Sequence, residues 1–225
     1  TRMGVLDKRT LRMVKKIQNA GWFDVMGGNI KAGKESNIFF AYGAQVFGYV
    51  CLKIFRTTVQ AFTRRNEYTR GDRRMEKEYT HISNPGRMVR TWALKEFRNL
   101  KRLVEAEVPC PRPYAIIGHV IAMEFLHEGL GPDPNPAPLL AEVAKQHANL
   151  DPETWSFIYA DVVISMWKMF TRAHLVHGDL SEYNIVFHEQ RAKIIDVGQS
   201  VDLSHPNSMK MLRRDCATIN SFFQR

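Results

Sequence analysis

Three polar side chains in the second half of the chain have the types and spacing that phosphoryl transfer requires. Asp179 is followed five positions later by Asn184, and Asp196 lies twelve positions beyond Asn184. One carboxylate can orient an attacking hydroxyl and accept its proton, while an amide and a second carboxylate hold Mg²⁺ against nucleotide phosphates. The apolar segments 185–187 and 192–195 have the pattern of two short strands that would present these groups at their ends. Because such a spacing also arises by chance, a polar turn in a globular domain remains the alternative.

A glycine-rich segment near the N-terminus is a second candidate for contact with phosphates. Within residues 27–37, Gly28 to Lys34 matches the start of a Walker A loop. However, Glu35 stands where that loop needs Ser or Thr, and residues 37–43 are β-branched and aromatic. We therefore predict the tip of a β-hairpin whose backbone can approach phosphates, with a turn that binds no ligand as the alternative. The residues expected to contact phosphate there are Gly33, Lys34, Glu35 and Ser36.

An apolar segment, residues 46–55, is predicted to be a strand and contains Lys53. A lysine in such a segment is costly to bury without an anionic partner, and an edge lysine whose amine reaches solvent is the alternative. The helix predicted over 84–105 offers a partner, because Glu96 lies on its apolar stripe. We therefore predict a buried pair in which Glu96 positions Lys53 to hold the α- and β-phosphates. The other members of the stripe are Val89, Trp92, Ala93, Leu100, Leu103 and Val104.

The remaining segments fit a two-lobed α+β domain. A helix over 7–20, capped by Asp7, precedes an N-lobe at about 22–124, a hinge at about 124–136 and a C-lobe at about 137–225. The apolar stripe predicted for the first helix consists of Leu11, Val14 and Ile17.

Further elements follow from hydrophobic periodicity and from Gly and Pro positions. Residues 56–83 are interpreted as a polar, basic insertion with one short helix near 73–79. The other predictions are strands 114–117 and 119–125 and helices 137–146, 152–173 and 207–223, the second of these helices being largely buried. Three residues at the start of the hinge, Met123, Glu124 and Leu126, are candidate adenine contacts. The backbone groups of Glu124 and Leu126 would bond the base, and a plain linker is the alternative.

Bulk composition argues against several classes of protein. The 225 residues are 44% hydrophobic and 24% charged, as in ordinary globular domains, and no apolar run approaches the length of a bilayer span. The start has no signal-peptide core, so we expect no membrane association and a cytoplasmic location. Three widely spaced cysteines, and eight histidines without paired spacing, argue against a disulfide framework or a zinc site.

Positive charge is concentrated in one part of the chain. Between Lys53 and Arg102 there are fourteen Lys or Arg and five Asp or Glu, so the surplus of this segment equals the net charge of +9 of the whole chain. Such a block favours a phosphate-rich partner, either a nucleotide or a nucleic acid, and a solvated basic face is the alternative.

The order of these parts (phosphate lid, strand Lys, helix Glu, hinge, D-x₄-N loop and metal-binding Asp) is that of protein kinases. Further strings of the chain are AGKESN at 32–37, LKIF at 52–55, YxxGD at 68–72, NPxRMV at 84–89, KExRNL at 95–100, VHGDLSEYN at 176–184, IDVxQSV at 195–201 and RDC at 214–216. In these strings the sequence resembles the RIO-type atypical protein kinases, in particular the first, Rio1-like, RIO subfamily. Gly198 stands where that family usually has Ser, and Ser36 where Ala is common; neither is expected to touch the chemistry.

The resemblance implies a kinase-like α+β fold with a mostly antiparallel N-lobe sheet and a truncated helical C-lobe. It also implies an ATP- and Mg²⁺-dependent serine/threonine kinase, with Mn²⁺ as a substitute metal, that phosphorylates itself and runs an ATPase cycle through an aspartyl-phosphate on Asp196. The family is linked to maturation of the small ribosomal subunit, so a pre-small-subunit particle of rRNA and ribosomal proteins is the implied partner. The basic block fits that partner, and the protein substrate is not identified by the sequence.

The resemblance and the residues together assign roles. Asp179 is the expected catalytic base, Asn184 and Asp196 are the expected metal ligands, and Lys53 with Glu96 holds phosphates. One rival is a small-molecule phosphotransferase of the aminoglycoside or choline kinase kind, which would need an acceptor pocket built from a larger C-lobe. Another is an ATP-switched, rRNA-binding assembly factor with little kinase activity, against which the filled catalytic positions count.

Overall fold

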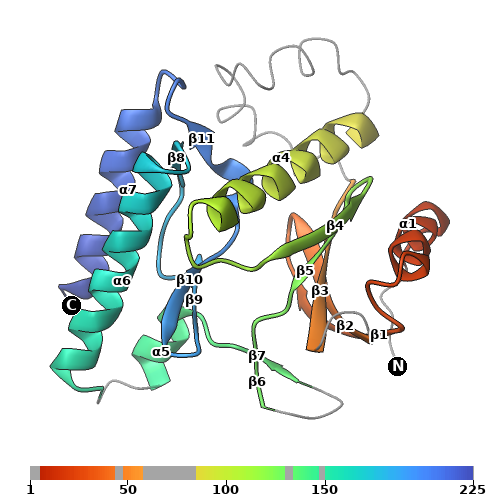
Figure 1. The fold of residues 1–225 in the computed structure, drawn as a ribbon, viewed down its shortest axis with the longest axis horizontal. Coiled ribbons are helices and arrows are strands. Elements are labelled where there is room, and N and C mark those ends of the chain that lie inside the picture. The colour runs from red at the N-terminus through yellow and green to blue at the C-terminus, as the bar shows by residue number, and fades with distance from the viewer. Residues whose placement is uncertain (1–5, 44–47, 58–84, 130–133, 147–149, 225) are drawn as a thin grey trace.

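The computed structural model describes residues 6–43, 48–57, 85–129, 134–146 and 150–224. Figure 1 shows an antiparallel sheet with helix α1 on its outer side, and the two long helices α6 and α7 at the opposite end of the molecule. Helix α4 (Pro85–Glu105) lies between them. The expected fold class, a two-lobed α+β domain with an antiparallel N-lobe sheet, is confirmed.

The N-lobe sheet has five strands in the order β1-β2-β3-β5-β4, and every neighbouring pair is antiparallel. The strands are β1 (Val25–Ala32), β2 (Ser36–Gly43), β3 (Gly48–Phe55), β4 (Pro113–Ile117) and β5 (Val120–Glu124).

Strand β3 is buried on both faces of the sheet over Val50–Phe55 and divides its side chains between two core clusters. Val50, Leu52 and Ile54 pack with α1 (Lys8–Asn19) in one core cluster. Cys51 and Phe55 belong to the other cluster, together with side chains of α4. Because side chains alternate along a strand, Lys53 lies on the face that α4 covers.

The C-lobe elements are short except for two helices. They are α5 (Leu140–Gln146), α6 (Pro152–Thr171), β8 (Leu175–Val176), β9 (Ile185–His188), β10 (Arg191–Ile194), the 3₁₀ turn η2 (Val197–Gln199), β11 (Val201–Asp202) and α7 (Ser208–Phe223). The hinge region contains β6 (His127–Glu128) paired with β7 (Asn135–Pro136). The predicted insertion beyond residue 57, with its helix near 73–79, lies outside the described residues.

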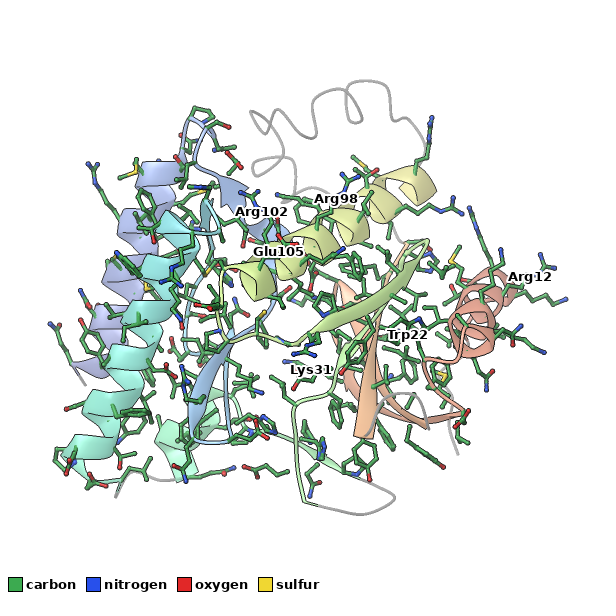
Figure 2. All side chains as sticks on the ribbon, viewed as in Figure 1. Arg12, Trp22, Lys31, Arg98, Arg102 and Glu105 are labelled. Carbon is green, nitrogen blue, oxygen red and sulfur yellow. The ribbon has the colours of Figure 1, made fainter. Side chains whose placement is uncertain are left out.

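The predicted stripe of helix α1 was wrong at one position. Leu11 is 41% exposed, and Met13 is buried beside Val14 and Ile17 instead. The cause is geometric, since the buried face is centred on Thr10, Met13, Val14 and Ile17, at helical spacings of three and four. Arg12 projects away from the sheet, on the outer side of the helix (Figure 2). Val104 at the end of α4 is likewise exposed, at 38%.

Two other boundaries differ from the prediction. Residues 27–32, expected in a loop, belong to β1, whose irregular register with β2 accommodates the glycines. The helix expected from residue 137 begins at Leu140. The Ala137 N–H instead donates to the Leu126 carbonyl, and the Pro138 carbonyl accepts from Phe187 N–H, both at 2.9 Å, so these residues form an extended connection.

Helix α6 is not largely buried, contrary to expectation. Ile158, Val162 and Met169 face the core, but Phe157, Ile164 and Trp167 are 57%, 50% and 55% exposed. The helix packs against β8 and β10 and lies at the end of the molecule, so one side of it is left facing outwards (Figure 1). Because α6 has apolar residues on all sides, its sequence predicted more burial than the structure shows.

No helix in the described parts of the chain combines the length and the apolar character needed to cross a membrane. The three cysteines are free thiols: Cys51 and Cys110 are buried and Cys216 is exposed.

A buried polar chain fixes α1 to the sheet. His119, in the turn between β4 and β5, is 3% exposed, and its Nε2 lies 2.9 Å from Thr10 Oγ1. The Thr10 hydroxyl in turn donates to Asp7 Oδ2 at 3.0 Å. Beside His119, Gly118 has a φ of 62°, and a Cβ there would come within 2.5 Å of Met13 Sδ. Burial lowers the pKa of His119 below its ordinary value of 6.5.

This pKa predicts a loss of stability in acid. Above pH 6.5 His119 is neutral in both states, but below it the unfolded chain takes up the proton more readily than the folded protein. Stability should therefore decline as pH falls below about 6.5. Urea unfolding at pH 7.5 and 5.5 measures the decline. It should be smaller in His119→Asn and unchanged in His174→Asn, which alters an exposed histidine. An equal decline in wild type and His119→Asn would contradict the prediction.

Candidate active site

Lys53 lies at the centre of the site. Its Nζ donates to both oxygens of Glu96, at 2.7 and 2.9 Å, and to Oδ1 of Asp196 at 2.9 Å. Lys53 and Glu96 are buried, whereas the Asp196 side chain is 52% exposed. Burial alone would lower the pKa of the Lys53 ammonium, but Asp196 and Glu96 outweigh it and raise the pKa above its ordinary value. The expected ion pair with Glu96 therefore forms, and Asp196 joins it.

Asp196 follows strand β10 in a backbone conformation that few side chains adopt. Its φ and ψ are 59° and 53°, in the left-handed region where Asp and Asn are the residues best tolerated after Gly. The turn behind it is held by Asn99, a buried residue of α4, whose Nδ2 donates to the Val197 carbonyl at 2.8 Å. Helix α4 thus supplies the partner of Lys53 and also fixes the segment that follows Asp196.

Gly198 lies in the same turn, close to Glu96. A Cβ at this position would be 3.1 Å from Glu96 Oε2 and 3.3 Å from Trp92 Nε1. A side chain there would require these neighbours to shift by a few tenths of an ångström.

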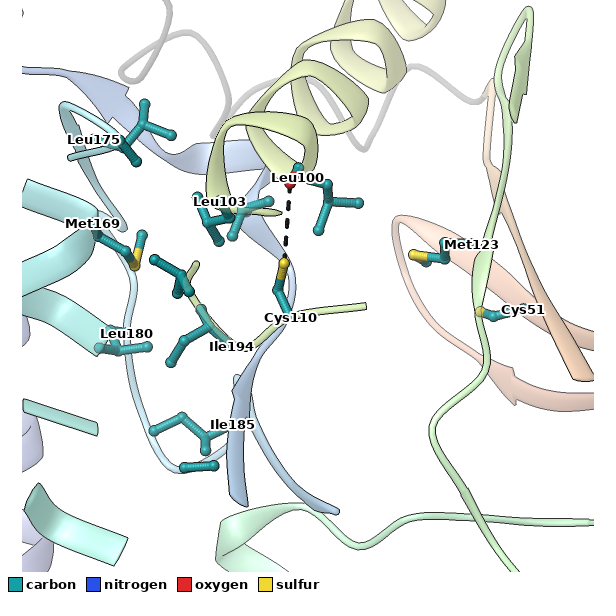
Figure 3. Close-up of a cluster of buried hydrophobic side chains, with 14 of the residues drawn as sticks. Cys51, Leu100, Leu103, Cys110, Met123, Met169, Leu175, Leu180, Ile185 and Ile194 are labelled. Atoms are coloured by element: carbon teal, nitrogen blue, oxygen red, sulfur yellow. Dashed lines mark hydrogen bonds between the residues drawn. The ribbon is translucent and has the colours of Figure 1, made fainter. Parts of the chain in front are cut away.

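A loop between β8 and β9 carries Asp179 and Asn184. Asn184 Nδ2 donates to the Asp179 carbonyl at 2.8 Å, and the Asn184 carbonyl accepts from Ile195 N–H at 3.0 Å. Leu180, Ile185 and Ile194 anchor this region in the main core (Figure 3). The loop is therefore attached to the segment that bears Asp196.

Asp179 is exposed to solvent. Burial of part of its carboxyl raises the pKa of Asp179 above its ordinary value, Asp196 and Asp215 add to the rise, and Arg214 opposes it. A raised pKa suits a group that must accept a proton from a hydroxyl.

Asp215 holds this loop from helix α7. Its carboxylate is buried, at 1% exposure, and accepts from Gly178 N–H at 2.8 Å and from Leu180 N–H at 3.1 Å. Burial raises the pKa of Asp215, while the two N–H donors act in the opposite direction. The Asp215 side chain thus fixes the residues on both sides of Asp179. Neighbouring Arg214 also donates to the Gly178 carbonyl.

A cleft of about 580 Å³ lies between the lobes. Every residue predicted from the sequence to contact nucleotide or metal lines it; Asp179 is the one site residue that does not. On the N-lobe side of the cleft, the Gly33 N–H donates to the Ser36 carbonyl at 2.9 Å and closes the turn between β1 and β2. The lining includes Gly33, Lys34, Glu35, Ser36, Lys53, Glu96, Met123, Glu124, Leu126, Asn184 and Asp196.

The hinge offers two backbone groups to this cleft. The Glu124 N–H donates to the Arg112 carbonyl at 2.8 Å, and the Leu126 carbonyl accepts from Ala137 N–H at 2.9 Å. In the described part of the chain the Leu126 N–H has no hydrogen-bond partner. The groups suited to an adenine edge are thus the carbonyl of Glu124 and the N–H of Leu126.

Asn184 and Asp196 supply the hard oxygen ligands that Mg²⁺ prefers, and both line the cleft. No group of three or more His, Cys, Asp or Glu side chains within the described residues could hold a metal ion. A site with two protein ligands fits an ion that is held jointly with nucleotide phosphates.

Comparison with known proteins decides the family. A family model described as the RIO domain matches residues 37–225. The chain belongs to the RIO family. Among its relatives, human serine/threonine-protein kinase RIO1 is 40% identical over 221 residues, and the match covers 98% of this chain and 37% of that protein. The RIO-type serine/threonine-protein kinase Rio1 of Haloferax volcanii is 38% identical over 221 residues, and the match covers 98% of this chain and 71% of that protein.

The chain spans 37% to 41% of the length of the first three RIO1 relatives, from human, Dictyostelium discoideum and Caenorhabditis elegans. Its similarity to them makes it a RIO1-type domain. A crystal structure of the Rio2 kinase-ADP/Mg²⁺-phosphoaspartate complex from Chaetomium thermophilum is similar, with a TM-score of 0.65 and 25% identity. The match covers 95% of this chain and 59% of that one.

Two positioning residues of this RIO domain were missed by sequence reasoning. Asn99 and Asp215 lie in matched motifs, but neither was given a role. The same signal that selected Glu96 was available for Asp215, since it occupies the buried stripe of α7 between Met211 and Ile219. A carboxylate in that position needs donors, and backbone N–H groups provide them here.

Removing one acceptor from Asp215 should loosen the Asp179 loop without touching nucleotide. In Asp215→Asn, we expect phosphoryl transfer to fall roughly 10- to 100-fold, because small misplacement of a reacting group is costly, with nucleotide affinity within about twofold of wild type. Single-turnover autophosphorylation and binding of a fluorescent ADP analogue measure the two quantities.

Cys216→Ser, at the next and exposed position of α7, is the matched control and should retain full activity. Equal losses of activity and nucleotide affinity in Asp215→Asn would indicate general unfolding rather than positioning.

Proposed function

We propose that this RIO domain is an ATP- and Mg²⁺-dependent serine/threonine protein kinase that also phosphorylates itself. The observation that carries the proposal is the contact of Lys53 with both Glu96 and Asp196, inside a cleft that also contains Asn184 and the hinge. In the reaction a hydroxyl oxygen bonds to the γ-phosphorus, the bond from that phosphorus to the β-phosphate oxygen breaks, and ADP leaves. Asp179 accepts the hydroxyl proton.

Each other group has a matching task in this proposal. Lys53 holds the α- and β-phosphates, and the backbone of residues 33–36 with Ser36 covers them. Asn184 and Asp196 would hold Mg²⁺, which neutralises phosphate charge when bound; Mn²⁺ accepts the same oxygen ligands and should substitute. Glu124 and Leu126 bond adenine, and Met123 lines the cleft beside them.

Asp179→Asn should lower phosphoryl transfer by a factor of about 10² to 10⁴, the usual contribution of a general base, and leave ATP affinity nearly unchanged. Glu189→Gln removes a carboxylate that is 74% exposed at the β9–β10 turn and serves as the control. Autophosphorylation rate and ATP dissociation constant are the measurements. Unchanged turnover in Asp179→Asn would refute the assignment.

We further propose an ATPase cycle through Asp196. Its half-exposed carboxylate lies in the cleft and has an oxygen beyond the one that meets Lys53. That oxygen can attack the γ-phosphorus and displace ADP, and water then hydrolyses the acyl phosphate. A hydroxylamine-sensitive label that is absent from Asp196→Asn would support this cycle, and a label of equal size in that variant would exclude it.

We propose a pre-small-subunit ribosomal particle as the partner of this domain. Helix α1 supports this proposal independently of the block at 53–102, most of which is not described. Five exposed basic residues cover α1, and Lys8, Arg12 and Lys15 point directly away from its buried face. A basic face of this kind fits an RNA backbone. We assign the domain to the cytoplasm, where free thiols such as those of its three cysteines persist.

Reversing two charges on α1 should weaken RNA binding and its salt dependence together. For Arg12→Glu with Lys15→Glu, we expect the slope of log affinity against log salt to fall by roughly 1 to 2, because each lost phosphate contact removes about 0.7 to 0.9. Binding of a small-subunit rRNA fragment across a salt series is the measurement. Lys210→Glu with Arg213→Glu, an equal charge change on the exposed side of α7, should alter the slope less. Identical effects of the two pairs would show that net charge alone matters.

A further inference from the structure

A second cavity, larger than the interlobe cleft, lies in the C-lobe between α5, α6 and α7, with a volume of about 1000 Å³. One wall of it is aromatic. Trp155 and Tyr159 of α6 meet Phe222 and Phe223 at the end of α7, with ring centroids 5.0 to 6.2 Å apart in edge-to-face arrangements. We call this hollow the aromatic cavity.

The aromatic cavity adjoins the loop that carries Asp179. Glu182 and Tyr183, three and four residues after Asp179, both line it. The Glu182 carbonyl accepts from Ala141 N–H of α5 at 3.1 Å, so the loop and the cavity wall are joined. Tyr183 is 57% exposed and lines the interlobe cleft as well. A chain whose hydroxyl lies at Asp179 therefore has the cavity within reach of its neighbouring residues.

The segment that usually holds a protein substrate is short here. Ordinary protein kinases have an activation segment between the metal-binding Asp and the A-P-E motif. In this chain only residues 197–207 separate Asp196 from α7, and η2 and β11 take up part of them. Asn99 and the pairing of β11 with β8 fix those residues against the core. Binding of a protein substrate must therefore use another surface near Asp179.

We propose that the aromatic cavity binds a large apolar side chain of the protein substrate, aromatic or branched aliphatic, a few residues from the Ser or Thr that is phosphorylated. The inference rests on the proposed kinase function.

The residues that line the cavity indicate which kind of group it binds. Among the described residues that line the cavity, only Lys145 and Glu182 are charged, which is too little for a polycation such as an aminoglycoside or for a nucleic acid backbone. Apolar rings around a preformed hollow favour an apolar side chain.

Two variants alter the cavity without touching the groups around Lys53. Ala144→Phe places a ring into the hollow from α5, and Phe223→Ala removes part of its wall. Ala160→Phe and Phe157→Ala make the same changes at exposed positions of α6 that do not line the cavity. All four variants should retain nucleotide affinity, which also reports that they fold.

The test uses a library of peptides with a central Ser and all residue types at the flanking positions. Wild type and the α6 controls should prefer Phe, Trp, Leu or Ile at one fixed distance from the Ser. Ala144→Phe and Phe223→Ala should lose that preference, with a KM for the selected peptide raised roughly tenfold, the effect of leaving one apolar side chain exposed.

Capture of the same library on the immobilised protein, with ADP and Mg²⁺, measures binding without phosphoryl transfer. If wild type transfers no phosphate to peptides or to itself, the kinase proposal fails, and the capture experiment still decides the cavity. The cavity proposal is overturned if no apolar preference is found by capture, or if the preference survives Ala144→Phe.

Discussion

One buried cation connects the parts of this molecule that function together. Lys53 comes from the sheet, Glu96 from the helix that crosses behind it, and Asp196 from the C-lobe, and all three meet within 2.9 Å. A buried lysine without these anions would be costly, so the sheet, α4 and the β10 segment must keep their relative positions. Helix α4 carries the greatest number of these constraints, because Glu96 and Asn99 project from one face of it toward two different segments.

The loop that carries Asp179 is held separately, by helix α7. Asp215 accepts hydrogen bonds from two backbone N–H groups of this loop, and α7 thereby determines where Asp179 stands. The loop held by α7 and the segment held by α4 are joined where the Ile195 N–H donates to the Asn184 carbonyl. A change in the orientation of either helix would therefore move both Asp196 and Asp179.

Much of this arrangement could be predicted from the sequence, and the failures have physical causes. Alternation and turn residues predicted the hairpins, and a carboxylate on an apolar stripe predicted the partner of Lys53. The extent of β1 was missed because its glycines resemble a loop. The exposure of α6 was missed because periodicity describes a helix but not what packs on its far side. The aromatic cavity was beyond prediction, since Trp155 and Phe222 are distant in the chain and only the tertiary fold brings them together.

The left-handed backbone at Asp196 restricts which residues can stand there for a reason unrelated to charge. Gly, Asn and Asp tolerate such dihedrals, whereas a β-branched or bulky residue would strain the turn. Of these three, only aspartate also brings an anion to Lys53. The backbone conformation and the need for a negative charge together leave aspartate as the one residue that satisfies both at position 196. Replacing it with another carboxylate, such as glutamate, would also require a change in the backbone dihedrals at this position.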